Sequence, residues 1–324
     1  MARPVTGRQP HLTALGFGAS QGGNLYRVTS DEDFAAAVDA AWDGGIRYFD
    51  TAPHYGLGLS ERRLGAALRS RPRDEYVVST KVGRLLVPSP ETAHLRDPDG
   101  FDVPAEHRRV WDFSRDGVRR SLEASLRRTG LDRIDVVYLH DPDEHWEQAA
   151  YEAVPALVEL REQGVIGAIG AGMNQSAMLA RFVAETDVDV VMCAGRFTLL
   201  EQGALTDLLP AAQARRVGVV IAGVYNSGLL ARDMPPSDAV YDYQQAPAEV
   251  IEHARRAAQV CRAYGVTLPE AALAFVRRHP AVVSTVVGMR DAAQVTETLR
   301  RTDADVPDQL WTALYEVGLL DVQS

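Results

Sequence analysis

Eight short hydrophobic runs recur along the chain, and most are followed by a segment in which apolar residues return with helical spacing. The runs predict buried strands at 12–19, 47–50, 76–82, 134–140, 168–173, 188–194, 218–223 and 283–287. The periodic segments predict helices at 31–43, 61–68, 114–130, 146–163, 176–184, 204–216, 248–264, 269–278, 292–301 and 308–317.

Serine and glycine residues mark several of these helix ends. Ser30 and Ser60 stand where N-caps are expected, Ser114 starts the next helix, and Gly164 closes the one after it. No linker of low complexity separates the alternating elements. The pattern therefore predicts an α/β fold, a (β/α)8 TIM barrel in which residues 1–324 form a single domain.

The main alternative is a doubly wound open sheet, which carries a glycine-rich phosphate loop after its first strand. The chain has Gly16 and Gly18 there, but the third glycine, Gly22, comes one place late and no helix is predicted to open. The sequence therefore favours the barrel.

Two connections are longer than the rest. Residues 84–113, after the third strand, and 225–247, after the seventh, contain Pro and Gly and show no clean period. Connections of this length are usually functional or disordered. The aromatic residues Phe101, Trp111 and Phe113 in the first connection favour a lid or pocket wall.

Composition excludes several classes of protein. The chain is 46% hydrophobic and 24% charged, with a net charge of −10, which argues against nucleic acid or an anionic membrane as the main partner. No apolar run approaches the ~18 residues of a membrane span, and the N-terminus lacks a signal-peptide core, so we expect a cytoplasmic protein. Cys193 in a predicted strand and Cys261 on a predicted helix indicate neither a disulfide framework nor a metal site.

Four residues with acid–base chemistry follow neighbouring strands. Asp50, Lys81 and His140 end the second, third and fourth strands, and Tyr55 follows Asp50; we call these four residues the tetrad. Strand ends converge on one face of a barrel. Singly, each residue has a structural explanation, such as a turn cap or a solvated charge. Together they predict a proton-transfer site.

In that site Lys81 would lower the pKa of Tyr55 and Asp50 would pair with Lys81. Tyr55 could then act as general acid or base while His140 orients the substrate oxygen. Such a site protonates an oxygen as a hydride reaches its carbon, or performs the reverse.

The same residues carry a family resemblance. The strings FDTAPHYG at 49–56, LSERRLG at 59–65, STKVG at 79–83 and YLHD at 138–141 resemble the aldo-keto reductase family, and the likeness covers nearly the whole chain. It implies that the tetrad is catalytic, with Tyr55 as the acid/base, and that a nicotinamide cofactor is bound without a Rossmann domain. The strings at 84–86, 112–114, 140–143, 172–175 and 226–230 most resemble the branch of L-fucose (D-threo-aldose) and pyridoxal dehydrogenases.

The resemblance also implies a cofactor site. Its expected residues are Asn174 near the nicotinamide amide, then Tyr225, Asn226, Gly228, Leu230, Gly288, Arg290, Gln294 and Glu297. NADP-preferring relatives place a Lys and then an Arg after strand eight, where this chain has Gly288 and Gln294. Only Arg290 remains as a cation, unless it is merely a solvated charge at a helix start. NAD is therefore expected to serve at least as well as NADP.

Substrate contacts are expected from the aromatic residues Tyr26, Trp111, Phe113 and Tyr225, and from the acceptors Asp141 and Asp143, although Asp-Pro-Asp is also a common turn. These groups favour oxidation of an aldose at its C1 hydroxyl to a lactone. The alternatives are reduction of small aldehydes or ketones, pyridoxal oxidation, or a cofactor-binding regulatory subunit that turns nothing over. The complete tetrad disfavours a silent scaffold, and the oligomeric state stays open.

Overall fold

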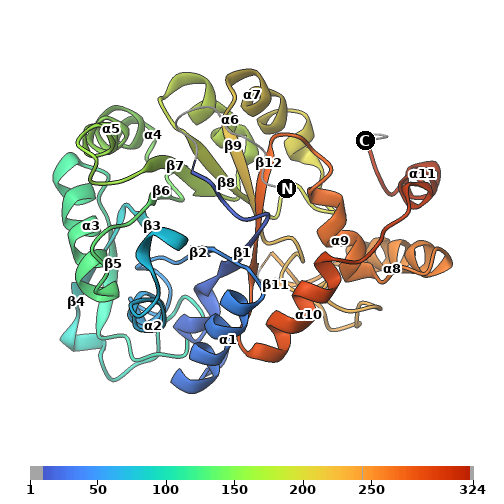
Figure 1. Cartoon of the computed structure of the whole chain (residues 1–324), viewed down its shortest axis with the longest axis horizontal. Coiled ribbons are helices and arrows are strands. Elements are labelled where there is room, and N and C mark those ends of the chain that lie inside the picture. Colours follow the sequence, from blue (N-terminus) through green and yellow to red (C-terminus); the bar gives the residue numbers. More distant parts are fainter. Residues whose placement is uncertain (1–9, 243, 322–324) are drawn as a thin grey trace.

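Eight parallel strands close into a barrel (Figure 1), in a computed structural model that describes residues 10–242 and 244–321. Around the ring they are β1 (Leu15–Gly18), β2 (Tyr48–Asp50), β3 (Val77–Val82), β6 (Val136–His140), β7 (Ala168–Met173), β8 (Val190–Ala194), β9 (Gly218–Ala222) and β12 (Val282–Gly288). Strand β12 pairs in parallel with β1 and closes the ring. The predicted (β/α)8 barrel is confirmed.

Helices surround the barrel (Figure 1) and shield the outer faces of the strands. They are α1 (Asp31–Asp43), α2 (Leu59–Leu68), α3 (Arg115–Thr129), α4 (Trp146–Gln148), α5 (Val154–Glu162), α6 (Ser176–Glu185), α7 (Leu208–Arg215), α8 (Ala248–Ala263), α9 (Leu268–Val276), α10 (Ala292–Thr302) and α11 (Asp308–Glu316). Helices α4 and α5 are joined through a π-helical stretch, Ala149–Ala153. No helix in the described part of the chain is long and apolar enough to cross a membrane.

Serine caps fix the starts of two helices as expected. Ser30 Oγ accepts a hydrogen bond from Asp33 N at 3.0 Å, and Ser114 Oγ accepts one from Gly117 N at 3.0 Å. Each bond satisfies one of the backbone donors that a helix leaves unpaired in its first turn.

The prediction that Ser60 caps α2 was wrong. The helix begins at Leu59, after Gly58 with φ +82°, so Ser60 lies inside its first turn. Its buried hydroxyl donates instead to the Ala19 carbonyl at 2.7 Å and lies 2.8 Å from Thr51 Oγ1. Ser60 therefore ties α2 to the ends of β1 and β2.

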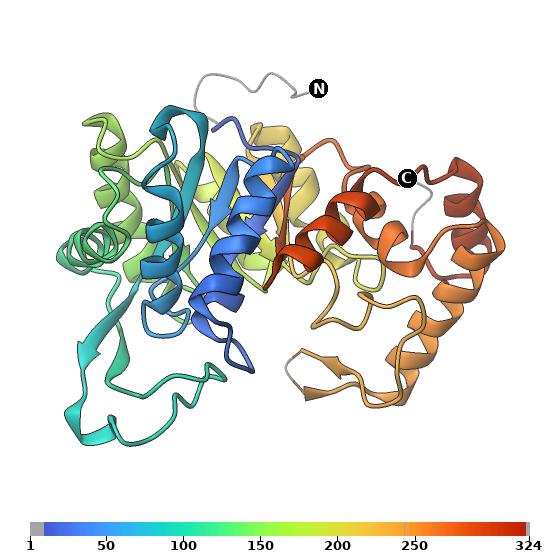
Figure 2. The same cartoon turned by 60° about the horizontal axis from the view of Figure 1, so that its bottom comes forward.

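Both long connections contain a hairpin that the sequence pattern did not reveal. Strand β4 (Arg84–Pro88) pairs antiparallel with β5 (His107–Trp111), and β10 (Val240–Tyr241) pairs with β11 (Gln244–Gln245). None of these short strands has a fully buried face, so none shows the alternation that marks a strand in sequence. The two connections extend beyond the same end of the barrel (Figure 2).

The first of these connections closes onto the loop between β1 and α1. Tyr26 N donates to Gly100 O at 2.8 Å, and Asp102 N donates to Asn24 O at 2.9 Å. This pairing holds residues 84–113 across one side of the barrel end.

Alternation along β2 sets the geometry of the site. Phe49 points outward and packs in the large core between barrel and helices, whereas Tyr48 belongs to a smaller cluster inside the barrel. Asp50 shares the inward face with Tyr48. A Cβ on Gly16 would lie 2.7 Å from the Tyr48 ring, so the missing side chain gives the ring its place in the barrel.

Candidate active site

Lys81 and Asp50 form a buried ion pair at the end of the barrel. Lys81 Nζ lies 2.6 Å from Asp50 Oδ2, and the two side chains keep only 3% and 4% of their surface exposed. The parallel register places Asp50 beside Ser79, so Lys81, two residues farther along β3, points to the same interior. Lys81 Nζ also donates to Thr51 O and to the Tyr55 hydroxyl, both at 3.1 Å. All three ammonium hydrogens therefore have acceptors.

A chain of buried, hydrogen-bonded hydroxyl groups leads from this ion pair into the barrel interior. Ser79 Oγ donates to Asp50 Oδ1 at 2.7 Å, Tyr48 OH lies 3.0 Å from Ser79 Oγ, and Tyr138 OH lies 3.2 Å from Tyr48 OH. Sequence reasoning missed these residues. The signal was available, because each stands two positions before a tetrad residue on the same strand and so shares its inward face.

Tyr55 keeps its proton more tightly than the sequence argument supposed. Burial raises the pKa of its phenol, and the neighbouring Lys81 ammonium lowers it but does not reverse the rise. Lys81 lowers the pKa of Tyr55 as expected, but desolvation raises it by more, so the net shift of the pKa is upward. At neutral pH Tyr55 is a phenol that accepts a hydrogen bond from Lys81.

Lys81 stays charged in the same surroundings. Burial alone would lower the pKa of Lys81, but the field of Asp50 and hydrogen bonds to Asp50 and Tyr55 raise it above its ordinary value. The site therefore holds a permanent cation next to a phenol, which is the arrangement that stabilises a phenolate when one forms.

His140 lies next to the phenol of Tyr55 as a neutral imidazole. Its ring centroid is 6.0 Å from that of Tyr55, with the rings nearly perpendicular. Burial, then the charges of Arg84 and Lys81, lower the pKa of His140 far below its usual value. A neutral imidazole can donate one hydrogen bond, so His140 can orient an oxygen held beside Tyr55.

An ion pair between Arg84, on the hairpin, and Asp141 lies beside His140. Arg84, on β4, forms an ion pair with Asp141, whose Oδ2 lies 3.7 Å from His140 Nε2. The Arg84 guanidinium also lies over Trp111 at 4.4 Å from the ring centroid, and it is 3.3 Å from His54 Nδ1. Asp141 was expected at the site from the sequence, whereas no role there was predicted for Arg84 or His54.

The expected aromatic walls are only partly at the surface. Trp111 is 44% exposed and Tyr26 is 63% exposed, so both can meet a ligand. Phe113 is fully buried, because its ring fills the space left by Gly83; the expectation that Phe113 lines the substrate pocket is not met. Phe101 is also buried, and its ring packs against that of Tyr55 with centroids 6.0 Å apart.

The expected cofactor residues after β7 and β9 lie at the same barrel end. Asn174 directly follows β7, and the loop after β9 carries Tyr225, Asn226, Gly228 and Leu230. Asn226 is buried, and its Oδ1 has no hydrogen-bond partner in the described part of the chain. Leu230 is fully buried in the core and its backbone N–H donates to Tyr225 O at 3.1 Å, so the structure does not present it to a ligand.

Arg290, which follows β12, has neither of the roles expected from the sequence. Its buried guanidinium donates to Leu25 O at 2.7 Å and Arg27 O at 2.9 Å, and it also contacts Thr29 Oγ1. Arg290 is thus neither a solvated charge nor an unoccupied cation, because it holds the loop between β1 and α1.

Gly288, Gln294 and Glu297 surround the start of α10. Gly288 ends β12 with an exposed backbone, and Gln294 Oε1 accepts from Arg290 N at 3.0 Å. Glu297 forms ion pairs with Arg300 and Arg301. The unpaired amide oxygen of Asn226, together with this open backbone before a helix start, fits the amides and phosphates of a nicotinamide dinucleotide.

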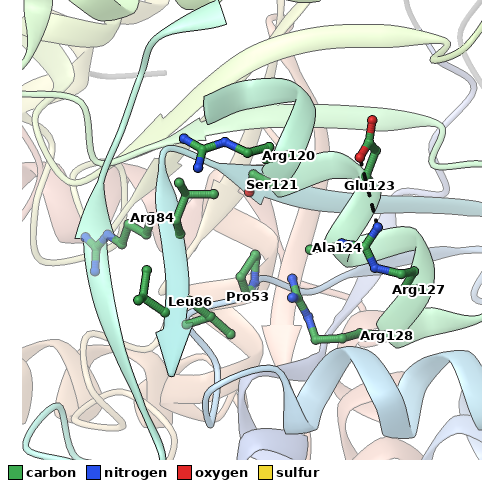
Figure 3. A pocket seen from close by; sticks show the side chains of 11 residues that line it. Pro53, Arg84, Leu86, Arg120, Ser121, Glu123, Ala124, Arg127 and Arg128 are labelled. Carbon is green, nitrogen blue, oxygen red and sulfur yellow. Dashed lines mark ion pairs between the residues drawn. The ribbon is translucent and has the colours of Figure 1, made fainter. Parts of the chain in front are cut away.

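A separate pocket of about 220 Å³ lies between β4 and α3, outside the barrel (Figure 3). It is lined by Pro53, Arg84, Leu85, Leu86, Val87, Arg120, Ser121, Glu123, Ala124, Arg127 and Arg128. The arginines that α3 contributes are paired with carboxylates, including the Arg127–Glu123 pair drawn in Figure 3. No member of the tetrad lines this pocket, so the candidate active site is the barrel end.

Comparison with known proteins identifies the family of this chain. A model of the Aldo/keto reductase family matches residues 14–318. The chain is 49% identical to a D-threo-aldose 1-dehydrogenase of Pseudomonas sp, with 95% of each chain covered, and 38% identical to a pyridoxal 4-dehydrogenase of Microbacterium luteolum, again with 95% of each covered. Among solved structures, it matches the glycerol dehydrogenase AKR11B4 of Gluconobacter oxydans with a TM-score of 0.77, at 22% identity over 97% of this chain and 94% of that one, which shows the shared fold. The chain belongs to the aldo/keto reductase family and is an oxidoreductase of the kind that uses NAD(P)H.

Proposed function

We propose that this protein oxidises an aldose at its C1 hydroxyl to the corresponding lactone, using NAD. The proposal rests on the buried Lys81 ammonium, whose Nζ lies 2.6 Å from Asp50 Oδ2 and 3.1 Å from the Tyr55 hydroxyl. The Asp141 carboxylate adds to it, because its Oδ2 lies 3.7 Å from His140 Nε2. A carboxylate beside the reacting centre suits a substrate with several hydroxyl groups. The relative at 49% identity, a D-threo-aldose 1-dehydrogenase, supports the same substrate class.

Each residue of the tetrad has a defined task in this proposal. His140 donates a hydrogen bond to the C1 oxygen and fixes its position beside the Tyr55 hydroxyl. Tyr55, as phenolate, removes the proton from the C1 hydroxyl, and Lys81 stabilises the phenolate beforehand. Asp50 keeps Lys81 in place and charged. The bound cofactor supplies the acceptor for the hydride that leaves C1, so the carbon is oxidised and the O–H proton ends on Tyr55.

The preference for NAD rests on the residues after β12. A 2′-phosphate is best bound by Arg or Lys, and the chain has Gly288 and Gln294 where such groups are expected. The nearby Arg290 donates its hydrogen bonds to Leu25, Arg27 and Thr29. Releasing it for a phosphate would give up these three hydrogen bonds, of which the one to the Thr29 hydroxyl is buried, and this costs free energy.

A substrate survey tests the proposal. The purified protein is incubated with NAD and a panel of aldoses that includes L-fucose and other D-threo-configured sugars, and NADH formation is followed by absorbance. Pyridoxal belongs in the panel because a relative at 38% identity is a pyridoxal 4-dehydrogenase. We expect turnover with aldoses and lactone as product.

Two results would contradict the proposal. Turnover of pyridoxal or reduction of simple aldehydes, with no aldose oxidised, would assign another substrate class to the same site. Binding of NAD with no turnover of any panel member would favour the regulatory-subunit alternative.

A further inference from the structure

His54, the residue before Tyr55, lies among the reacting groups of the candidate site. Its ring centroid is 5.4 Å from His140, 5.9 Å from Tyr55 and 5.2 Å from Phe101. Its backbone carbonyl accepts a hydrogen bond from Arg109 at 2.8 Å, which fixes the chain at this point. The side chain keeps 16% of its surface exposed, so it is not a sealed core residue.

The neighbours of His54 decide which of its nitrogens carries a proton. Arg84 Nη1 lies 3.3 Å from Nδ1, within hydrogen-bonding distance, whereas the Asp99 carboxylate is farther from the same nitrogen, at 3.8 Å. A guanidinium only donates hydrogen bonds, so Nδ1 is the acceptor. Burial, followed by the charges of Arg109, Arg84 and Lys81, lowers the pKa of His54 to about 2, so the imidazole is neutral. A neutral ring with an accepting Nδ1 carries its hydrogen on Nε2.

Nε2 has no hydrogen-bond partner within residues 10–242 and 244–321, although it is the donor of this ring. The cations near the phenol are already committed. Lys81 is shared among three acceptors, and Arg84 binds Asp141. The Nε2 hydrogen of His54 is thus a donor beside Tyr55 and His140 that the protein leaves for a ligand.

We propose that His54 is a specificity-determining residue: its Nε2–H donates a hydrogen bond to the hydroxyl on C2 of the substrate, one carbon from the oxygen held by Tyr55 and His140. The inference rests on the proposed aldose oxidation and adds the residue that recognises the hydroxyl on the carbon next to C1. It also explains why Arg84 points its guanidinium at a histidine, since that contact fixes the tautomer whose donor faces the ligand.

The experiment compares three proteins on three substrates. The proteins are wild type, His54→Phe, which keeps a ring of similar size without a donor, and His54→Gln, whose amide nitrogen restores a donor near the position of Nε2. The substrates are an aldose accepted by wild type, its 2-deoxy analogue and its 3-deoxy analogue. The measured quantity is the ratio of kcat/KM for the parent sugar to kcat/KM for each analogue.

We expect wild type to prefer the parent over the 2-deoxy sugar by roughly 10- to 100-fold, which is the range for one hydrogen bond made in a buried site. His54→Phe should reduce this ratio to within about threefold of one, and His54→Gln should recover part of it. The ratio for the 3-deoxy sugar should be the same in all three proteins within about threefold. Thermal unfolding of each variant shows whether the protein is folded, and the ratio is internal to each variant, so a general loss of activity does not affect it.

The outcomes separate this inference from the proposed function. If wild type oxidises aldoses but His54→Phe keeps the full preference for the parent over the 2-deoxy sugar, the role of His54 is overturned and the proposed function stands. If the change appears with the 3-deoxy sugar instead, the assignment to C2 is wrong. If wild type oxidises no aldose, the proposed function and the inference fail together.

Discussion

Lys81 donates a hydrogen bond to the Tyr55 hydroxyl over 3.1 Å, at a barrel end where burial raises the pKa of that phenol. The two side chains come from different strand ends, 26 residues apart in sequence. Because of this contact, a cation is already next to the phenol before the proton moves. Folding therefore provides the free energy that positions the cation, and the reaction does not have to.

Tyr55→Phe should reduce kcat for the accepted aldose by at least about 100-fold, because the general acid/base is lost. The phenyl ring can keep the contacts of Tyr55 with Phe101 and His140. NAD affinity, measured by quenching of protein fluorescence, should therefore stay within about threefold of wild type. Retention of more than a tenth of the activity would assign proton transfer to another group.

Lys81→Met should lower the free energy of unfolding by about 3–5 kcal/mol, since it leaves the buried Asp50 carboxylate without its partner. Adding Asp50→Asn to that variant removes the unpaired charge and should restore much of the stability. Neither variant should recover activity, because the cation beside Tyr55 is missing from both. Urea unfolding and kcat measured on the same samples check both parts.

A single variant, Asp50→Asn, completes this double-mutant cycle. If the losses in free energy of unfolding of the two single variants add up to the loss of the double variant, the two residues are not coupled. The contribution of the ion pair would then be overestimated.

The pH dependence should report Tyr55. Oxidation needs the phenolate, and burial keeps the pKa of Tyr55 above its ordinary value of about 10, although Lys81 offsets part of the shift. The phenolate fraction therefore rises about tenfold per pH unit below that pKa, and kcat/KM for oxidation should rise from pH 7 to 10 without a plateau. In the reverse direction, which needs the phenol, the rate should stay flat over that window.

The histidines should not contribute to these profiles. His140 and His54 both have pKa values lowered by burial and by nearby cations, His54 to about 2, so both imidazoles are neutral at pH 7 and above. A plateau in the oxidation profile near pH 7 would point to a histidine as the base and would contradict the role given to Tyr55.

Cofactor choice should change with the residue at position 294. Gln294→Arg places a guanidinium at the start of α10, and it should raise kcat/KM with NADP by about tenfold or more while changing the value with NAD much less. Gln294→Met serves as the matched control, because it removes the same amide without adding charge. A strong NADP preference in the wild-type protein would refute the proposed use of NAD.

The barrel and the tetrad could be read from the sequence because both depend on local patterns. Continuous apolar runs ending in Asp50, Lys81 and His140 predict parallel strands, and parallel strands in a barrel place their carboxyl ends together. The boundaries of α1 and β7 agree with the prediction to the residue. The start of α2 was misjudged at Ser60, whose hydroxyl is used in a contact with Ala19, a distant residue that no local rule includes.

Charge and burial around the site were decided by the tertiary structure. The sequence by itself determined which residue types stand at the strand ends, since hydrophobic periodicity and chain order are local properties. Only the folded chain decided that desolvation exceeds the effect of Lys81 on Tyr55, that Arg290 is held by a loop more than 260 positions earlier, and that Arg84 reaches His54 and Asp141 from a hairpin. Each of these depends on distance and on exclusion of water, and both arise when segments far apart in sequence pack together.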